Sequence, residues 1–372
     1  MMKIKNKKTI TVAELRTLLE NKSPVQVLDV RPKEEREAWN IPESKFVDVY
    51  SKLKAGEKNL FSDIEFHQDV PVVTLCGAGK TSMIAMEQLR ENGIEAYSLE
   101  GGMREWTTAW NTAQTTDKQD TTILQIRRTG KGCISYMLEN NGEAIVIDAS
   151  LDAEVYSNIA KKNNWTIKYV IDTHIHADHF SRAKQLSEKV NATLYLPNQN
   201  IVAYAFKPII DGTILKFGNT QLKAIHTPGH TLESYSYLVN NESLFSGDTL
   251  FTEGVGRPDL KASIEVARQK SSLLYQSLQK LLALQDTLTV YPGHISKPVA
   301  FDGNLICRNL EEIKNNVEVL QLNEENFIAN LLQKIPETPP NYEEIVKLNL
   351  RGTTEGADLI ELEAGANRCA IS

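Results

Sequence analysis

The chain has 372 residues, of which 41% are hydrophobic and 24% are charged, and its formal net charge is −7 at pH 7. This length predicts two domains, and the acidic balance argues against a general nucleic-acid binder or a membrane-surface binder. No apolar run reaches the roughly 20 residues that a membrane span needs, and the four cysteines are widely spread, so we expect free thiols and a cytoplasmic location.

The first hundred residues alternate between helix and strand patterns. Residues 11–20 open with Thr11 and Glu14 at capping-box spacing and carry apolar residues on one helical face. Three short apolar segments predict strands and one periodic segment predicts a helix: residues 25–30, 71–75 and 94–102 for the strands, and 81–93 for the helix. Apolar strands separated by helices predict a parallel sheet with helices on both faces.

The composition changes after this region. Residues 111–122 (NTAQTTDKQDTT) are polar and lack periodicity, and we expect the interdomain linker within them, at residues 113–120. The predicted domains are therefore residues 1–112 and residues 121–372.

The second domain combines hairpin and helix patterns. Alternating segments around Asn-Asn-Gly and Asn-Asn predict hairpins at residues 133–150 and 237–248. Helical patterns stand at about residues 152–164, 181–190 and 262–285. Hairpins mixed with helices predict two sheets with helices on their outer sides.

The segment TLCGAGKTS, residues 74–82, joins a cysteine to a glycine-rich loop. A nucleotide-binding P-loop needs Gly where Thr74 stands, so that interpretation fails. A strand instead brings Cys76 to its carboxyl end and a helix follows, so backbone N–H groups point at the sulfur and favour a thiolate. The predicted sulfur- or anion-binding residues are Gly77, Ala78, Gly79, Lys80, Thr81 and Ser82.

Three motifs in this order, VLDVRPKEEREAWNIPES, CGAGKTS and LEGGMREW, resemble a single rhodanese domain across about residues 8–112. The resemblance implies that Cys76 is catalytic, carries a persulfide and passes its sulfane sulfur between a donor and an acceptor, with thiosulfate or sulfite as small-molecule partners. It also implies that Asp29 and Arg31 brace the loop.

Six of the seven histidines lie between residues 174 and 294, most of them in polar motifs that follow apolar strand patterns. The ends of such strands converge at one edge of a sheet, and imidazole and carboxylate groups there suit a borderline divalent transition metal. The motifs THIHADHF, HTPGHT, FSGDT and VYPGHI supply the candidate ligands His174, His176, Asp178, His179, His230, Asp248 and His294.

The order His-x-His-x-Asp-His, then His, Asp and His, resembles the metallo-β-lactamase superfamily across about residues 121–372. The resemblance implies an αββα sandwich with a metal site at one edge. The predicted architecture is therefore an α/β rhodanese domain followed by an αββα metallo-β-lactamase sandwich.

Two metal chemistries stay open for this site. All seven candidate ligands together suit a dinuclear zinc hydrolase of the glyoxalase II type, which cleaves a thioester with water bridged between two ions. Two histidines and one carboxylate alone suit Fe(II), with open positions for O2 and a sulfur substrate. A regulatory protein whose rhodanese unit only senses sulfur is a non-enzymatic alternative.

The segment GDTLFTEGVGRPDL favours iron, because it resembles the Gly-Arg-x-Asp stretch that follows the metal-binding Asp in persulfide dioxygenases. This resemblance implies one Fe(II) per chain, with zinc as an alternative or replacement, and oxidation of a low-molecular-weight thiol persulfide by O2 to sulfite, coupled to sulfur transfer through Cys76. The implied iron ligands are His174, His230 and Asp248, while His176, Asp178, His179 and His294 would orient the ligands or hold a second metal.

Arg257 is the predicted substrate-binding residue, through the carboxylate of the thiol, and an ion pair with Asp259 is its structural alternative. We expect Cys133, Cys307 and Cys369 to be ordinary core residues and the C-terminal residues 348–369 to serve domain packing. A homo-oligomer is compatible with the sequence, and no nucleic-acid or membrane partner is expected.

Overall fold

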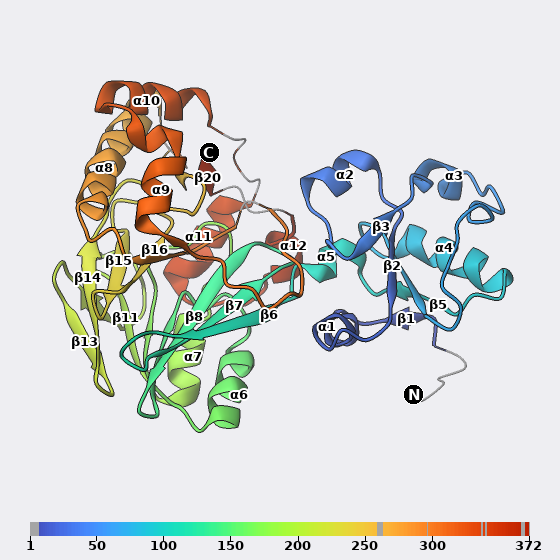
Figure 1. Ribbon diagram of the computed structural model, residues 1–372, viewed down its shortest axis with the longest axis horizontal. Helices are drawn as coiled ribbons and strands as arrows, with labels where there is room; N and C mark the ends of the chain where they lie inside the picture. Colours follow the sequence, from blue (N-terminus) through green and yellow to red (C-terminus); the bar gives the residue numbers. More distant parts are fainter. Residues whose placement is uncertain are drawn as a thin grey trace.

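The computed structural model describes residues 7–258, 263–295, 297–335, 338, 341–365 and 369–371. The chain forms two bodies side by side, a smaller N-terminal one and a larger one made from the rest (Figure 1). The predicted α/β domain followed by an αββα sandwich is confirmed. Within the described ranges, no helix is both long and apolar enough to cross a membrane.

The N-terminal domain is built on a five-stranded parallel sheet in the order β1-β5-β4-β2-β3. Its strands are β1 (Thr9–Ile10), β2 (Gln26–Asp29), β3 (Ser44–Phe46), β4 (Val72–Leu75) and β5 (Ala96–Leu99). Its helices are α1 (Val12–Glu20), α2 (Lys33–Ala38), α3 (Tyr50–Lys54), α4 (Lys80–Glu91) and α5 (Gly102–Trp106).

Helices cover both faces of this sheet, because neighbouring residues of a strand point to opposite sides. Val73 of β4 packs in one core with α1 and α5, whereas Val72 packs in another with α3 and α4. Helix α1 starts at the predicted capping box: the Thr11 hydroxyl accepts the Glu14 N–H, and the Glu14 carboxylate accepts the Thr11 N–H.

The second domain has a seven-stranded sheet in the order β12-β11-β10-β9-β8-β7-β6 and a six-stranded sheet in the order β13-β14-β15-β16-β18-β19. The first sheet contains β6 (Asn111–Thr116), β7 (Thr122–Arg128), β8 (Cys133–Asn140), β9 (Glu143–Ile147), β10 (Thr166–Ile171), β11 (Thr193–Pro197) and β12 (Lys207–Ile209). The second contains β13 (Ile214–Phe217), β14 (Thr220–His226), β15 (Tyr235–Val239), β16 (Ser243–Gly247), β18 (Thr289–Pro292) and β19 (Arg308–Asn309). The predicted hairpins are confirmed as the antiparallel pairs β8–β9 and β15–β16.

Helices pack on the outer sides of the two sheets, so the layers are αββα. The seven-stranded sheet packs against α6 (Ala153–Asn163) and α7 (Ala183–Val190). The six-stranded sheet packs against α8 (Ile264–Leu282), α9 (Leu310–Asn316), the 3-10 helix η1 (Glu318–Gln321) and α10 (Glu324–Gln333). The remaining elements are α11 (Tyr342–Arg351), α12 (Leu359–Leu362) and the pair β17 (Val255–Gly256) and β20 (Ala370–Ile371). One aromatic core, with Tyr136, Phe245 and Tyr291 in contact, fills the space between the sheets.

The expected linker is not an unstructured segment. Residues 111–116 form β6, which pairs antiparallel with β7 from Asn111 opposite Arg127 to Thr116 opposite Thr122. The side chain of Asp117 then accepts the N–H groups of two later residues and closes the turn into β7. Strand β6 is the edge of its sheet, where polar side chains are common. Because its sequence lacks an apolar pattern, we predicted a linker there and not a strand. The domain limits themselves stay a prediction.

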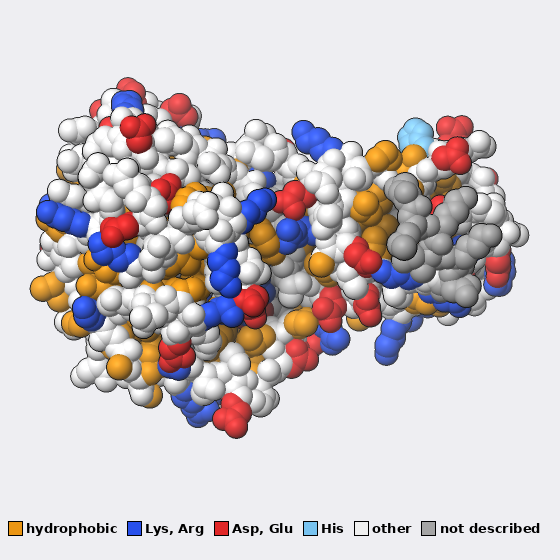
Figure 2. Space-filling view, turned by 90° about the horizontal axis from the view of Figure 1, so that it is seen from below, with side chains coloured by type: hydrophobic (Ala, Val, Ile, Leu, Met, Phe, Trp, Pro, Cys, Tyr) orange, Lys and Arg blue, Asp and Glu red, His pale blue; other side chains and the backbone are white. Residues whose placement is uncertain are grey.

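The two domains are in direct contact. The Trp39 indole N–H of the N-terminal domain donates to the Thr129 carbonyl at 3.0 Å. The Phe301 N–H of the second domain donates to Glu43 at 2.7 Å. Figure 2 shows acidic and basic side chains interspersed over one face of the molecule.

Candidate functional site

The Cys76 loop lies where a strand, a loop and a helix follow directly on one another. Cys76 comes immediately after β4, and Gly79, with φ of 83°, leads into α4 at Lys80. The thiol is 2% exposed, and the Ser82 hydroxyl donates to its sulfur at 3.3 Å. Among the other predicted loop residues, Thr81 is buried whereas Ala78 and Lys80 are exposed. The buried sulfur therefore has a hydroxyl donor, and the lysine lies at the open side of the loop.

Helix α5 supports this loop from behind. The N–H groups of Met103 and Arg104 donate to the carbonyls of Cys76 and Gly77 at 2.8 and 3.0 Å. Gly102 lies so close that a Cβ there would be 2.2 Å from the Cys76 carbonyl, and its φ is 59°. Two features therefore require glycine at this point of the LEGGMREW motif.

Asp29 and Arg31 form a buried ion pair at 2.7 Å. Arg31 also donates to the carbonyls of Glu35 and Trp39. These contacts of Arg31 fix the segment after β2, which includes α2. Because β2 and β4 are neighbours in the sheet, this segment begins beside the start of the Cys76 loop.

The metal candidates all lie in loops that follow strands and are all buried. His174 follows β10, Asp248 follows β16, and His230 lies in the turn between β14 and β15. One ligand atom from each of these three lies within 4.8 Å of the others. Asp248 Oδ2 is 4.0 Å from His174 Nε2 and 3.6 Å from His230 Nε2. The structure thus brings together the three residues that were predicted as iron ligands.

Two of these atoms lack a hydrogen-bond partner among the described residues, namely His174 Nε2 and Asp248 Oδ2. A buried polar atom left unpaired costs about 1–3 kcal/mol, and a cation between them would remove that cost. The other ring nitrogens are already fixed: His174 Nδ1 lies 2.9 Å from the Thr173 hydroxyl, and His230 Nδ1–H donates to the Arg257 carbonyl at 2.8 Å. Each imidazole is therefore oriented with Nε2 toward the site, as in metal-binding histidines.

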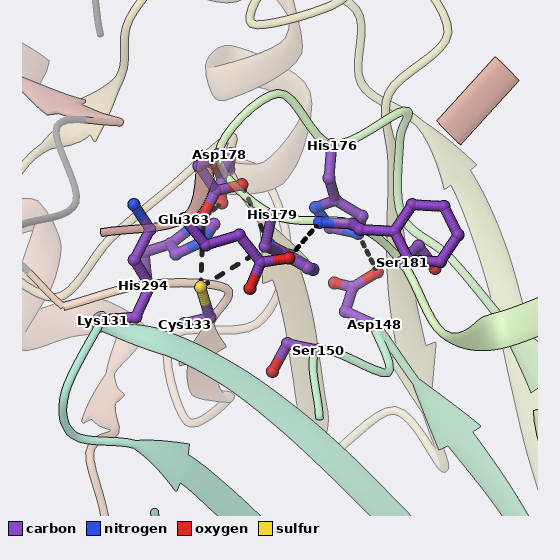
Figure 3. A network of polar contacts seen from close by, with 12 residues as sticks. Lys131, Cys133, Asp148, Ser150, His176, Asp178, His179, Ser181, His294 and Glu363 are labelled. Atoms are coloured by element: carbon purple, nitrogen blue, oxygen red, sulfur yellow. Dashed lines mark hydrogen bonds and ion pairs between the residues drawn. The ribbon is translucent and has the colours of Figure 1, made fainter. Parts of the chain in front are cut away.

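Asp178, His179 and His294 form a neighbouring cluster that also contains Cys133. The Cys133 thiol is 3.1 Å from Asp178 Oδ2 and 3.5 Å from His179 Nδ1. His294 lies between the two carboxylates, with Nδ1 2.6 Å from Asp248 and Nε2 2.9 Å from Asp178. Figure 3 shows Cys133, Asp178, His179 and His294 joined in one network.

The polar contact of His176 is with a different group, although the centre of its ring lies 4.2 Å from that of His179 and 4.3 Å from that of His174. His176 Nε2 is 3.2 Å from Asp148 Oδ1, and together with Asp172 these residues make a separate buried group. Asp148 also accepts the Thr173 N–H and hydroxyl. Asp148 therefore links His176 to the residue that orients His174.

The protonation states of His174, His230 and Asp248 suit a cation. Burial holds the pKa of His174 well below its ordinary value and also lowers the pKa of His230. Burial would raise the pKa of Asp248, but the neighbouring histidines outweigh it and lower that pKa. Neutral imidazoles and an ionised carboxylate are the protonation states that bind a metal.

Arg257, the predicted substrate-binding residue, is fully buried. Its carbonyl accepts the Nδ1–H of His230, so its backbone helps to orient a candidate ligand. Its alternative partner Asp259 lies outside the described residues.

Two cysteines expected to be ordinary core residues lie at the metal centre instead. Cys133 contacts Asp178, and Cys369 groups with Asp248 and His294 because β20 pairs with β17. Asn349 and Glu363 of the C-terminal region also reach the loop that carries His176 and His179. The C-terminal residues, expected to serve domain packing, thus pack against the loop that carries these candidate ligands. The only sequence signal was the position of Cys133 at the start of a strand in the metal-binding domain.

Each of the two predicted domains matches a family profile over part of its length. The profile described as Rhodanese-like domain matches residues 11–109, and the profile described as Metallo-beta-lactamase superfamily matches residues 128–206 and 198–294.

Among curated relatives, the hydroxyacylglutathione hydrolase of Francisella philomiragia is 35% identical over 167 residues, which are 43% of this chain and 61% of that protein. This chain thus spans about three fifths of the length of that relative. The hydroxyacylglutathione hydrolase of Pelagibacter ubique is 30% identical over 240 residues, 62% of this chain and 94% of that protein.

Two solved structures share the fold. A metallo-beta-lactamase from Staphylococcus aureus has a TM-score of 0.55 and 27% identity, covering 67% of this chain and 74% of its own. ETHE1 from Myxococcus xanthus has a TM-score of 0.52 and 26% identity, covering 64% of this chain and 98% of its own.

Proposed function

Because the chain belongs to the metallo-β-lactamase superfamily and carries a rhodanese-like domain, we propose that it oxidises a low-molecular-weight thiol persulfide with O2 and transfers sulfane sulfur through Cys76. The observation that carries this proposal is the set of buried ligand atoms on His174, His230 and Asp248, two of which lack any other partner in the described structure. Two histidines and one carboxylate are the ligand set of non-haem Fe(II) oxygenases. The resemblance of GDTLFTEGVGRPDL to persulfide dioxygenases and the structural similarity to ETHE1 from Myxococcus xanthus support it.

The proposed reaction is RSSH + O2 + H2O → RSH + SO3²⁻ + 2H⁺, which balances in atoms and charge. His174, His230 and Asp248 would hold Fe(II), which when bound would supply open coordination positions for the persulfide and O2. Thr173 and the Arg257 carbonyl hold the two imidazoles in their binding orientation. Burial of the centre excludes water from competing reactions.

The Cys76 loop would handle the same sulfur pool. The Cys76 thiolate takes the outer sulfur of a donor such as thiosulfate or a thiol persulfide, and the donor leaves as sulfite or thiolate. The reverse transfer returns that sulfur to an acceptor. Because the two sites share one chain, the product of one is at high effective concentration for the other.

A dinuclear zinc thioesterase is the second candidate. The relatives from Francisella philomiragia and Pelagibacter ubique bear the name hydroxyacylglutathione hydrolase. Asp178, His179 and His294 could hold a second ion beside the first.

Oxygen uptake and metal content distinguish the two candidates. Anaerobically iron-loaded protein is given glutathione persulfide, and O2 consumption, sulfite and bound metal are measured on one sample. The proposal expects rapid uptake with about one iron per chain. No uptake, together with two zinc ions per chain and cleavage of a glutathione thioester, would overturn it.

A further inference from the structure

The C-terminal segment (residues 341–365) places two buried side chains against the metal-binding loop. Asn349 comes from α11 and Glu363 follows α12, and both are buried. Figure 3 shows Glu363 beside His179 and Cys133 in the polar network of the centre. The loop that they contact, residues 172–182 between β10 and α7, is called here the metal loop.

Asn349 uses its whole amide on the backbone of this loop. Its Nδ2 donates to the carbonyls of His176 and His179 at 2.8 and 2.9 Å. Its Oδ1 accepts the N–H of Ser181 at 2.8 Å. Both donors and the acceptor are engaged, and an aspartate could not make the two donated bonds.

Glu363 binds the next peptide group of the loop. Its Oε1 accepts the Phe180 N–H at 2.8 Å and pairs with Arg182 at 2.7 Å, while its Oε2 pairs with Arg128 at 2.6 Å. Backbone groups in an irregular buried loop must find partners outside regular secondary structure. Two side chains more than 160 residues further along the chain supply them here.

We propose that Asn349 and Glu363 are positioning residues that hold the metal loop in its metal-binding shape before a metal arrives. They act through the backbone of residues 176–181, which carries Asp178 and His179 and lies directly after His174. The inference rests on the proposed metal centre, but it holds for iron or zinc and for either reaction.

Glu363 also contacts the N-terminal domain, whereas Asn349 does not among its described bonds. The Thr107 hydroxyl donates to the Glu363 carbonyl at 3.2 Å, and Arg128 Nε donates to the Thr107 carbonyl at 2.7 Å. Thr107 follows α5, the helix that supports the Cys76 loop. Substitution of Asn349 therefore tests the metal loop alone.

The test is Asn349→Asp, which keeps the size of the side chain but sets an oxygen against two carbonyls. Cobalt(II) affinity is measured by chelator competition on the full chain, together with the visible cobalt spectrum and sulfur transfer at Cys76. Loss of a group that orients a metal ligand typically costs about 10–100-fold in affinity, and the loop that Asn349 holds carries His174 as well as Asp178 and His179. We therefore expect a loss of that size, a changed spectrum and unchanged sulfur transfer. The matched control Asn163→Asp makes the same change at an exposed residue of α6 and should leave cobalt affinity unchanged.

Cobalt affinity within about twofold of the unsubstituted protein, with the same spectrum, would overturn the proposal. If Asn349→Asp does not fold, Asn349→Ala removes the repulsion and is judged by the same two measurements. Failure of the proposed function is separate: a chain that binds cobalt but consumes no O2 still allows the positioning role, whereas a chain that binds no cobalt refutes both.

Discussion

The Cys76 loop is contained in residues 74–82, whereas the candidate metal ligands are spread from His174 to His294 and receive contacts from Asn349 and Glu363. The first site is one strand, one turn and the start of one helix. The metal centre forms only where the ends of several strands, the metal loop and the C-terminal segment come together in the folded chain. The two sites should therefore respond differently to substitutions far from them in sequence.

The same comparison applies to chemistry. In the Cys76 loop a single nucleophile is supported by a serine hydroxyl and by the backbone. In the metal centre the positions of the buried imidazoles and carboxylates depend on one another. For example, His294 contacts both Asp248 and Asp178. Removal of one member should disturb the others, so effects there will not be additive.

The largest expected effect is from His230→Ala. We expect loss of O2 uptake by more than about 100-fold, beyond the usual cost of losing an outer partner, with sulfur transfer at Cys76 within about twofold. Persulfide-dependent O2 consumption and thiosulfate sulfurtransferase activity are measured on one preparation. His226→Ala, which replaces a half-buried histidine four residues earlier, is the matched control. Joint loss of both activities would mean that the sites are not independent.

Cys76→Ser is the reciprocal change. It should abolish sulfur transfer, because a serine hydroxyl does not ionise near neutral pH or carry a persulfide, and leave O2 uptake with added persulfide intact. Cys307→Ser, at a half-buried free thiol, is the control and should change neither activity. If Cys76→Ser also stops O2 uptake from free persulfide, then sulfur must pass through Cys76 before it is oxidised.

The sequence was sufficient to predict what is local or strictly patterned. The capping box at Thr11, the strand–loop–helix around Cys76 and both hairpins depend on neighbouring residues, and the order of histidine motifs identified the sandwich. It was not sufficient for contacts made only by folding. Strand β6 is polar and lies at the edge of its sheet, with β7 as its neighbour. Nothing near Asn349 or Glu363 in sequence indicates that they reach the metal loop, and the only signal for Cys133 is its place at the start of a strand.

Glu363→Gln should have an intermediate effect that extends to both regions. Removing one partner of a buried ion pair costs about 3–5 kcal/mol of unfolding free energy, because the buried Arg128 loses its countercharge. Glu361→Gln, two residues earlier at an exposed pair with Arg104, should stay within about 0.5 kcal/mol. Urea unfolding at pH 7 measures both, and equal values for the two variants would contradict the role of Glu363.

The pH dependence of this effect has a defined sign. Burial would raise the pKa of Glu363, but Arg128 and Arg182 outweigh it and lower that pKa to about 2. A carboxylate with a lowered pKa in the folded state stabilises it above the ordinary pKa, and that stabilisation is lost as the pH falls. The difference in unfolding free energy between the unsubstituted protein and Glu363→Gln should therefore be largest above about pH 4.5 and shrink toward pH 2. A constant difference over that range would contradict the assignment.

The smallest expected effect comes from replacing a glycine of α5 by alanine. A comparison of two glycine substitutions separates the cost of backbone strain from the cost of a contact with the Cys76 loop. Gly102→Ala and Gly93→Ala both place a Cβ at positive φ, at 59° and 78°, which costs about 1–2 kcal/mol. At Gly93 the new Cβ meets nothing within 4 Å, whereas at Gly102 it would lie 2.2 Å from the Cys76 carbonyl. Gly102→Ala should therefore also move the loop and reduce sulfur transfer, while O2 uptake stays unchanged in both variants. If Gly102→Ala and Gly93→Ala transfer sulfur equally well, then the Cys76 loop does not depend on its packing against α5, and its geometry is set by β4 and α4 alone.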